Sequence, residues 1–155
     1  MAIRDLCDWI ERVDELGELT RIAGADPDTD VGGLTDLYQW DMGNPALLFD
    51  GMPGYCPGHR ILSNILPSLP RLALTLNLDA AHSKRAFVDA LRNQLATLRP
   101  IPATVVDDGP VMANRQSGDA VDLTQFPAPR WHPRDGGQFL GTGDIVVMRA
   151  PMAAG

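Results

Sequence analysis

The strongest constraint on the fold of this 155-residue chain is a change in sequence pattern at Pro100. Before that proline, apolar residues recur every three or four positions or gather in short runs, which indicates helices alternating with buried strands. After it, proline and glycine become frequent and helical spacing almost disappears. The pattern therefore predicts a compact domain over residues 1–100 and a differently built region over residues 101–149.

The first part is expected to be a small mixed α/β domain. Its pattern predicts helices over residues 3–16, 30–42, 70–76 and 83–98, and strands over residues 19–22, 46–49 and 60–66. Gly17 is placed to end the first helix, and Ser83 is placed to cap the last one. The order helix–strand–helix–strand–strand–helix–helix indicates an α/β fold of the α+β type.

The region after Pro100 is expected to be the beginning of a β domain. Strands are predicted over residues 111–115 and 144–149, with a shorter candidate at 121–123. Phe126, Trp131 and Phe139 are large apolar side chains that need a core to bury them. Their presence favours a folded domain over a linker.

Charge and composition argue against several classes of partner. The formal net charge is −7 and the isoelectric point is about 4.7, which argues against binding to nucleic acid or to an anionic membrane. The N-terminus has no signal-peptide core, and no apolar run approaches the roughly 18–20 residues of a membrane span. We therefore expect a soluble, cytoplasmic protein in which Cys7 and Cys56 are free thiols.

The histidines are the first candidates for chemistry. His132, next to Trp131, could serve a metal or proton-transfer site, or it could be a loop histidine packed under the tryptophan. His59 and His82 have no acidic or cysteine neighbour at the spacing of metal ligands. The histidines alone therefore leave the chemistry open.

Several acidic and glycine-rich positions predict turns. Asp107-Asp108 is expected in a solvated turn, and Asp135 is expected to cap another. The glycines between 136 and 143 also predict tight turns. They do not form a dinucleotide- or phosphate-binding signature, because no helix clearly follows them.

Five short motifs occur in an order that points to one family. They are Leu16-Gly17-Glu18-Leu19, Asn44-Pro45-Ala46-Leu47-Leu48-Phe49, the segment from Ile65 to Leu74 that contains Arg71, Val121-Asp122-Leu123 to Pro127, and Trp131-His132 to Thr142-Gly143. Taken together they make the chain similar to the UbiD family of decarboxylases, which use prenylated flavin mononucleotide (FMN). The last motif is the most specific of the five.

This resemblance implies a fold and a chemistry. It implies that the second part is the start of a split β-barrel that binds the flavin, incomplete in this chain. The implied reaction is the non-oxidative decarboxylation of an aromatic or α,β-unsaturated carboxylic acid, in which the prenylated FMN accepts the electrons left on carbon. The family also implies Mn²⁺ or a similar divalent ion with K⁺, a possible homo-oligomer, and a flavin prenyltransferase that supplies the cofactor.

The resemblance assigns one site residue in this sequence, Thr142, near the flavin pocket. The family's metal-binding Asn, His and Glu and its catalytic Arg and two Glu correspond to positions beyond Gly155. No catalytic and no metal-binding residue is therefore assigned here. The expected function is that of an N-terminal portion, inactive and without bound cofactor by itself, of a UbiD-like carboxy-lyase. The alternative is a non-catalytic subunit or binding module that associates with a full-length decarboxylase.

Residues 150–155 are expected to be a frameshifted tail. One GC-rich coding of a typical family continuation, Arg-Asp-Pro-Asp-Gly-Gly-Trp-Val-Asn, becomes Arg-Ala-Pro-Met-Ala-Ala-Gly followed by a stop when a single base is deleted. That product matches residues 149–155.

Overall fold

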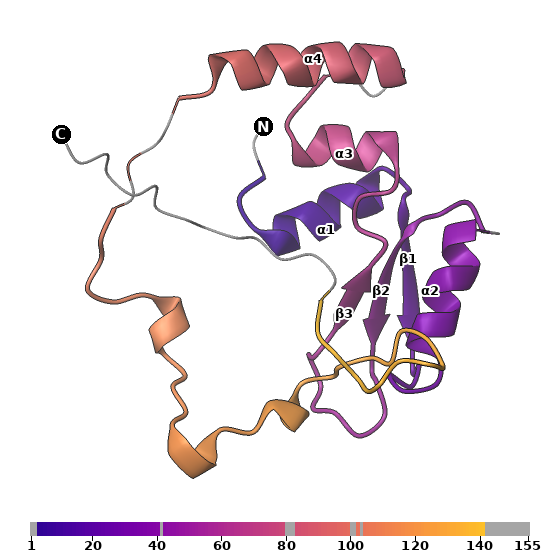
Figure 1. Cartoon of the computed structure of the whole chain (residues 1–155), viewed down its shortest axis with the longest axis vertical. Coiled ribbons are helices and arrows are strands. Elements are labelled where there is room, and N and C mark those ends of the chain that lie inside the picture. Colours follow the sequence, from indigo (N-terminus) through magenta and orange to yellow (C-terminus); the bar gives the residue numbers. More distant parts are fainter. Residues whose placement is uncertain (1–2, 41, 80–82, 100–101, 103, 142–155) are drawn as a thin grey trace.

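The computed structural model describes residues 3–40, 42–79, 83–99, 102 and 104–141. Four α-helices and a three-stranded sheet form in residues 3–99 (Figure 1). In chain order they are α1 (Leu6–Glu15), β1 (Leu19–Ala23), α2 (Val31–Trp40), β2 (Ala46–Asp50), β3 (Ile61–Ser63), α3 (Leu69–Thr75) and α4 (Lys84–Thr97). The predicted order of elements in the first part is confirmed.

The sheet has the order β1-β2-β3, so β2 is the central strand. β1 and β2 run parallel, with Leu19 opposite Ala46, and α2 forms the crossover between them. β2 and β3 are antiparallel, with Leu48 opposite Leu62. β2 is buried on both faces. A strand covered on both faces needs apolar side chains at successive positions, and the sequence of β2 is accordingly a continuous apolar run.

Alternate side chains of β2 enter two different cores, as the two-residue repeat of a strand requires. Leu47 and Phe49 pack with Val31 of α2 on one face. Ala46 and Leu48 pack with Trp9, Ile10 and Val13 of α1 on the other. The sheet is therefore the middle layer of a small α/β sandwich, and α2 is the one described helix on its face (Figure 1).

The helix ends follow local capping chemistry. Asp5 caps α1 by accepting a hydrogen bond from the backbone N–H of Asp8 at 2.8 Å, and Gly17 follows the helix with φ of 71°. Ser83 caps α4 by accepting from the N–H of Ala86 at 3.1 Å, as predicted. α3 and α4 form a third small core around Ala73 and Phe87.

Arg71 is fully buried and connects the loops that lead into the strands. Its guanidinium pairs with the Glu18 carboxylate at 2.8 Å and donates to the carbonyls of Asn44 at 2.7 Å and Ile65 at 3.1 Å. Burial lowers the pKa of Arg71, while the charge of Glu18 and its hydrogen bond act in the opposite direction. The arginine holds the starts of β1 and β2 against the loop that leads into α3.

The region beyond residue 101 differs from the prediction. The structure has 3₁₀ turns at Pro110–Met112, Gly118–Ala120 and Leu123–Gln125, and no strand among the described residues of this region. The strands predicted over 111–115 and 121–123 are therefore wrong, and the strand predicted over 144–149 lies outside the described residues.

Local hydrogen bonds explain why residues 121–123 do not form the predicted strand. The Asp122 carboxylate accepts from the backbone N–H of Thr124 at 2.9 Å and from its hydroxyl at 2.6 Å, and these bonds lower the pKa of Asp122. Such a side-chain cap competes with strand pairing.

No helix in the described part of the chain is long and apolar enough to cross a membrane.

Candidate functional site

Residues 126–141 return to the first domain and cross one end of α2 and the sheet (Figure 1). The backbone N–H of Arg130 donates to the carbonyl of Pro27 at 3.0 Å. The Arg130 guanidinium pairs with Asp28 at 2.9 Å, and Gln138 donates to the same carboxylate at 3.3 Å. The residues that make these contacts are about a hundred positions apart in sequence. The contacts attach the second region to the loop before α2.

Gly32 allows this attachment to be close. A Cβ placed on Gly32 would lie 2.1 Å from the carbonyl oxygen of Trp131 and 2.6 Å from that of Arg130, well inside van der Waals contact. A Cβ placed on Gly33, the next residue of α2, would have nothing within 4 Å. The absence of a side chain at Gly32 is therefore what lets the backbone of residues 130–131 lie against the helix.

Trp131 extends the core on the α2 face of the sheet. Its side chain packs against the cluster that contains Val31, Leu47 and Phe49, and its indole N–H donates to the carbonyl of Phe139 at 3.3 Å. Phe126 and Phe139 remain 42% and 41% exposed. Only one of the three predicted core aromatics of this region therefore reaches the core.

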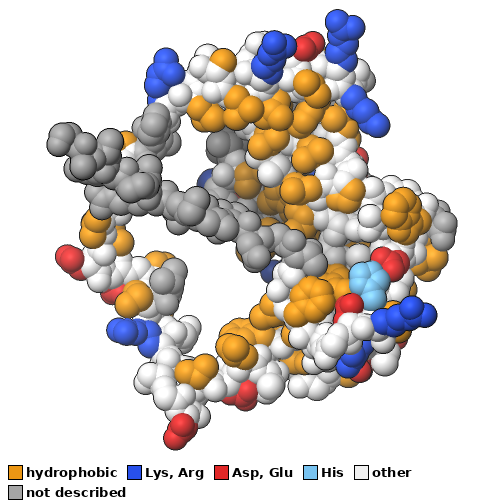
Figure 2. Space-filling model, in the orientation of Figure 1, with side chains coloured by type: hydrophobic (Ala, Val, Ile, Leu, Met, Phe, Trp, Pro, Cys, Tyr) orange, Lys and Arg blue, Asp and Glu red, His pale blue; other side chains and the backbone are white. Residues whose placement is uncertain are grey.

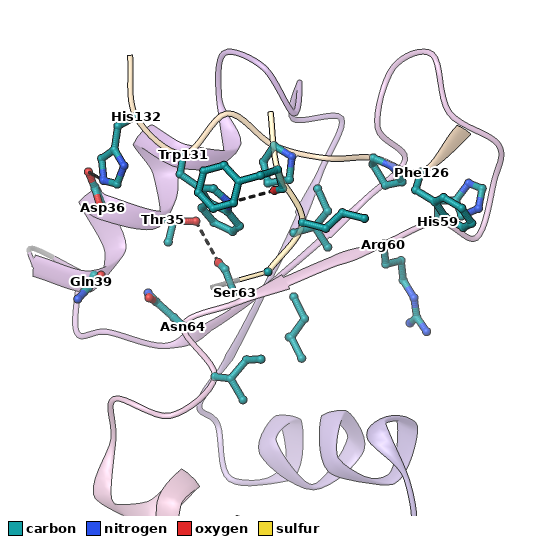
Figure 3. Close-up of a pocket in the computed structure, with 18 of the residues that line it drawn as sticks. Thr35, Asp36, Gln39, His59, Arg60, Ser63, Asn64, Phe126, Trp131 and His132 are labelled. Atoms are coloured by element: carbon teal, nitrogen blue, oxygen red, sulfur yellow. Dashed lines mark hydrogen bonds and ion pairs between the residues drawn. The ribbon is translucent and has the colours of Figure 1, made fainter. Parts of the chain in front are cut away.

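A cavity of about 730 Å³ lies between β3 and residues 126–141. One wall is formed by residues 59–66 and by Thr35, Asp36 and Gln39 of α2, and the other by residues from Phe126 to Gly141, with Trp131 over the middle (Figure 3). This volume is within the range of about 300–1,000 Å³ that is typical of ligand pockets. The cavity is therefore the candidate binding site of the described part of the chain.

The buried polar atoms of the cavity belong to hydroxyl, amide and imidazole groups. Thr35 and Ser63 hydrogen-bond to each other through their hydroxyls at 3.0 Å and are both buried. The side-chain nitrogens Asn64 Nδ2 and His59 Nδ1 are buried and have no hydrogen-bond partner. Asn64 has φ of 54°, a left-handed conformation that ends β3 and aims its side chain differently from a strand residue.

The predicted candidate His132 lies at the rim of the cavity. Its imidazole is 61% exposed, with Nε2 at 3.8 Å from Asp36 and Nδ1 at 3.6 Å from Asp135. It is therefore not packed under Trp131, although it has two acidic neighbours. Asp135 caps the turn as predicted, because its carboxylate accepts from the N–H of His132 at 2.8 Å.

The other candidates lie apart from the cavity or outside the described residues. Asp107 and Asp108 are exposed, with a bend instead of the expected turn at Asp107, and Cys7 and Cys56 are free and exposed. Thr142, the predicted cofactor-binding residue, and His82 lie outside the described residues.

The described residues do not fit the metal-bound cofactor that the family implies. No group of three or more His, Cys, Asp and Glu side chains in the described ranges is arranged to hold a metal ion.

Sequence reasoning missed Gly32, Asn64 and Arg130. A glycine pair inside a predicted helix was a usable signal for Gly32, because a helical glycine is unfavourable unless close packing requires it. Nothing in the sequence indicated that Arg130 pairs with Asp28, since the two are far apart in the chain.

Comparison with known families and structures gives matches over both regions. Residues 10–91 match the model of the 3-octaprenyl-4-hydroxybenzoate carboxy-lyase N-terminal domain, and residues 104–154 match that of the carboxy-lyase Rift-related domain.

Two curated relatives cover almost the whole chain. The pyrrole-2-carboxylic acid decarboxylase of Pseudomonas aeruginosa is 29% identical over 95% of this chain and 31% of its own length. Ferulic acid decarboxylase 1 of Candida dubliniensis is 27% identical over 93% of this chain and 31% of its own length. The chain thus spans about 31% of the length of these relatives.

A solved structure matches as well. The vanillic acid decarboxylase of Sedimentibacter hydroxybenzoicus in its open form has a TM-score of 0.76 and 25% identity over 89% of this chain and 30% of that one. The first family match alone spans more than half of the sequence, and the second follows it in the expected order. The resemblance predicted from the five motifs is confirmed: the chain belongs to the UbiD family of carboxy-lyases, as an N-terminal domain followed by part of a Rift-related domain.

Proposed function

We propose that this chain supplies the N-terminal domain and the first part of the Rift-related domain of a UbiD-type carboxy-lyase. The reaction of the whole enzyme is the non-oxidative decarboxylation of an aromatic or α,β-unsaturated carboxylic acid. The observation that carries the proposal is the succession of the two family matches along one chain, with relatives named as decarboxylases of aromatic acids.

The proposed cofactor of the whole enzyme is prenylated FMN with Mn²⁺ or a similar divalent ion and K⁺, made available by a flavin prenyltransferase. Thr142 is proposed to lie at the cofactor. The proposed role of the described residues is structural. They hold residues 126–141, which belong to the Rift-related match, against α2. By itself the 155-residue chain is proposed to be inactive.

The alternative is a non-catalytic subunit that associates with a full-length decarboxylase. Exposed apolar side chains at the cavity favour it, namely Leu66 at 48%, Phe126 at 42%, Phe139 at 41% and Leu140 at 62%. Figure 2 shows hydrophobic side chains gathered on this face of the molecule. Large exposed apolar patches mark interaction surfaces. Co-purification with a full-length decarboxylase from the native cell supports this alternative, whereas recovery without one argues against it.

A chimera tests the main proposal. Residues 1–141 replace the matching N-terminal part of the Pseudomonas aeruginosa decarboxylase, and CO₂ release from pyrrole-2-carboxylate is measured. We expect a folded, flavin-loaded chimera that retains activity, and loss of activity when Gly32→Ala is added but not when Gly33→Ala is added. A chimera that folds and loads flavin but releases no CO₂ contradicts the proposal.

A further inference from the structure

Helix α4 carries an apolar stripe on an exposed side. Val88 and Leu95 are 60% and 57% exposed, and Leu98, which caps the end of the helix, is 59% exposed. Together with the half-buried Leu91 they recur at intervals of three, four and three residues. This is the spacing with which one helix packs against another. The stripe therefore has the pattern of a helix–helix contact while it remains exposed to solvent.

The stripe is not the surface that packs on α3. Phe87 is buried in the small core that α3 and α4 share, and Leu91 packs against that core. On the same side of α4, the side-chain amide of Gln94 donates to the carbonyl of Leu76 at 3.2 Å. The contact with α3 thus uses one side of α4 and leaves most of the stripe open.

The edge of the stripe that lies away from α3 is basic. Arg85 and Arg92 are seven residues apart, and each comes three positions before an apolar residue of the stripe, Val88 or Leu95. Lys84 and Arg85 begin a helix whose first turn contains no acidic residue, although acidic residues are favoured there. Figure 2 shows Lys and Arg side chains along the outer edge of α4 and hydrophobic side chains between that edge and α3.

The basic side chains of this edge have no opposite charge beside them in the described part of the chain. Lys84, Arg85 and Arg92 are exposed and form no ion pair with a described residue. Asp89 follows Arg85 by four positions in the same helix, yet the two do not pair. A row of positive charges beside an apolar stripe is complementary to a helix that has an apolar face with an acidic edge.

A second copy of α4 does not supply this complement. Two copies packed antiparallel would place their arginine edges against each other, and like charges across a contact repel. Two copies packed parallel would turn the arginine edge of each toward the side of the other that α3 already occupies. The charges therefore favour a different, acidic partner.

From these observations we infer that the exposed stripe of α4 is a docking surface for an amphipathic helix whose apolar face has an acidic edge. The apolar side chains of the partner pack on Val88, Leu91 and Leu95, and its carboxylates pair with Arg85 and Arg92. This inference does not depend on the proposed decarboxylation, since it concerns only described residues of α3 and α4.

The test uses the whole chain and two synthetic helical peptides of about 18 residues, slightly longer than α4. Both peptides carry the same leucines at three- and four-residue spacing, and the flanking positions are glutamate in one and lysine in the other. Affinities come from calorimetry, and NMR shifts of the backbone amides locate the contact. The net charge of −7 favours the lysine peptide at long range, so a preference for the glutamate peptide requires a local basic surface.

We expect saturable binding of the glutamate peptide, with shifts confined to α3 and α4, at least about tenfold tighter than binding of the lysine peptide. The preference should shrink as the salt concentration rises, because exposed charges are screened. Failure of the glutamate peptide to bind, equal affinities, tighter binding of the lysine peptide, or shifts outside these two helices would overturn the inference.

Two matched pairs of variants test the assigned contacts. Arg92→Glu should reduce the preference for the glutamate peptide at least about threefold, whereas Arg115→Glu, the same change at an exposed arginine outside α4, should leave it unchanged. Leu95→Gln should weaken binding of both peptides about tenfold, whereas Leu123→Gln, at a leucine 69% exposed outside α4, should not. Because Arg92 and Leu95 are exposed, thermal melts should show that both variants fold. Wild-type binding by either α4 variant rules out the contact assigned to that residue.

Sedimentation of the chain without peptide tests the other occupant, a second copy. We expect no dimer that depends on α4. A concentration-dependent dimer that Leu95→Gln abolishes and Leu123→Gln does not would assign the stripe to self-association and overturn the inference.

Discussion

The contact at Gly32 yields the sharpest prediction about how the two regions are joined. In Gly32→Ala the new methyl group would lie 2.1 Å from the carbonyl oxygen of Trp131 and 2.6 Å from that of Arg130. Both neighbours are backbone atoms, so the whole segment must move away or the helix must shift. Forcing an extra methylene into a packed site typically costs about 1–3 kcal/mol, and we expect a loss of that size in the free energy of unfolding.

Gly33→Ala is the matched control. It lies in the same helix, is exposed, and has nothing within 4 Å of the new methyl group. Replacing a helical glycine by alanine should stabilise the protein by about 0.5–1 kcal/mol. The two neighbouring substitutions therefore change stability in opposite directions.

The assay combines urea unfolding with amide hydrogen exchange. Gly32→Ala should also speed exchange at the N–H of Arg130, which donates to Pro27, and of Phe139, which donates to Pro129. Gly33→Ala should leave both unchanged. Equal stabilisation by the two substitutions, with unchanged exchange at Arg130, would refute the claim that residues 130–131 lie directly on α2.

Three further predictions concern the first domain. Arg71→Met should cost about 3–5 kcal/mol in urea unfolding, because it leaves Glu18 and the carbonyls of Asn44 and Ile65 without their shared donor; Arg71→Lys should lose less, and a neutral effect of Arg71→Met would contradict the assigned role. The pKa of Asp8 is lowered by the backbone N–H of Arg4 and then by the side chain of Arg12, so its stabilising effect is present above its unfolded pKa and is lost as pH falls through the lowered value. Melting temperatures measured from pH 5 to below about pH 4 should thus fall less steeply in Asp8→Asn than in the wild type, and parallel curves would exclude Asp8 as a contributor. Ser83→Ala should cost about 1 kcal/mol through the lost cap of α4, whereas Ser117→Ala, at a turn where no side-chain cap bond forms, should be neutral in the same melts.

The first domain could be predicted closely because its signals are local or periodic. The apolar run from Ala46 to Phe49 requires cover on both faces, and the structure provides it. The predicted ends of the helices and strands were less accurate than their order. The third strand is only Ile61–Ser63, since Asn64 adopts a left-handed conformation, and the first helix begins at Leu6 because Asp5 serves as its cap.

The second region and the cavity could not be predicted in the same way. A strand was expected over residues 121–123, but the side chain of Asp122 forms local hydrogen bonds that favour a 3₁₀ turn. The cavity depends on contacts between residues far apart in the chain, such as Gly32 with Trp131 and Arg130 with Asp28. Only the family resemblance indicated that the two regions follow each other in one family.

The most direct test of the central claim is CO₂ release by the purified 155-residue chain, produced together with a flavin prenyltransferase and supplied with Mn²⁺ and K⁺. The Pseudomonas aeruginosa decarboxylase, prepared in the same way, is the positive control. We predict no stoichiometric flavin and no CO₂ above background from pyrrole-2-carboxylate, ferulate or vanillate with this chain alone. Stoichiometric prenylated FMN together with CO₂ release would contradict the view that this chain supplies only the N-terminal part of the enzyme.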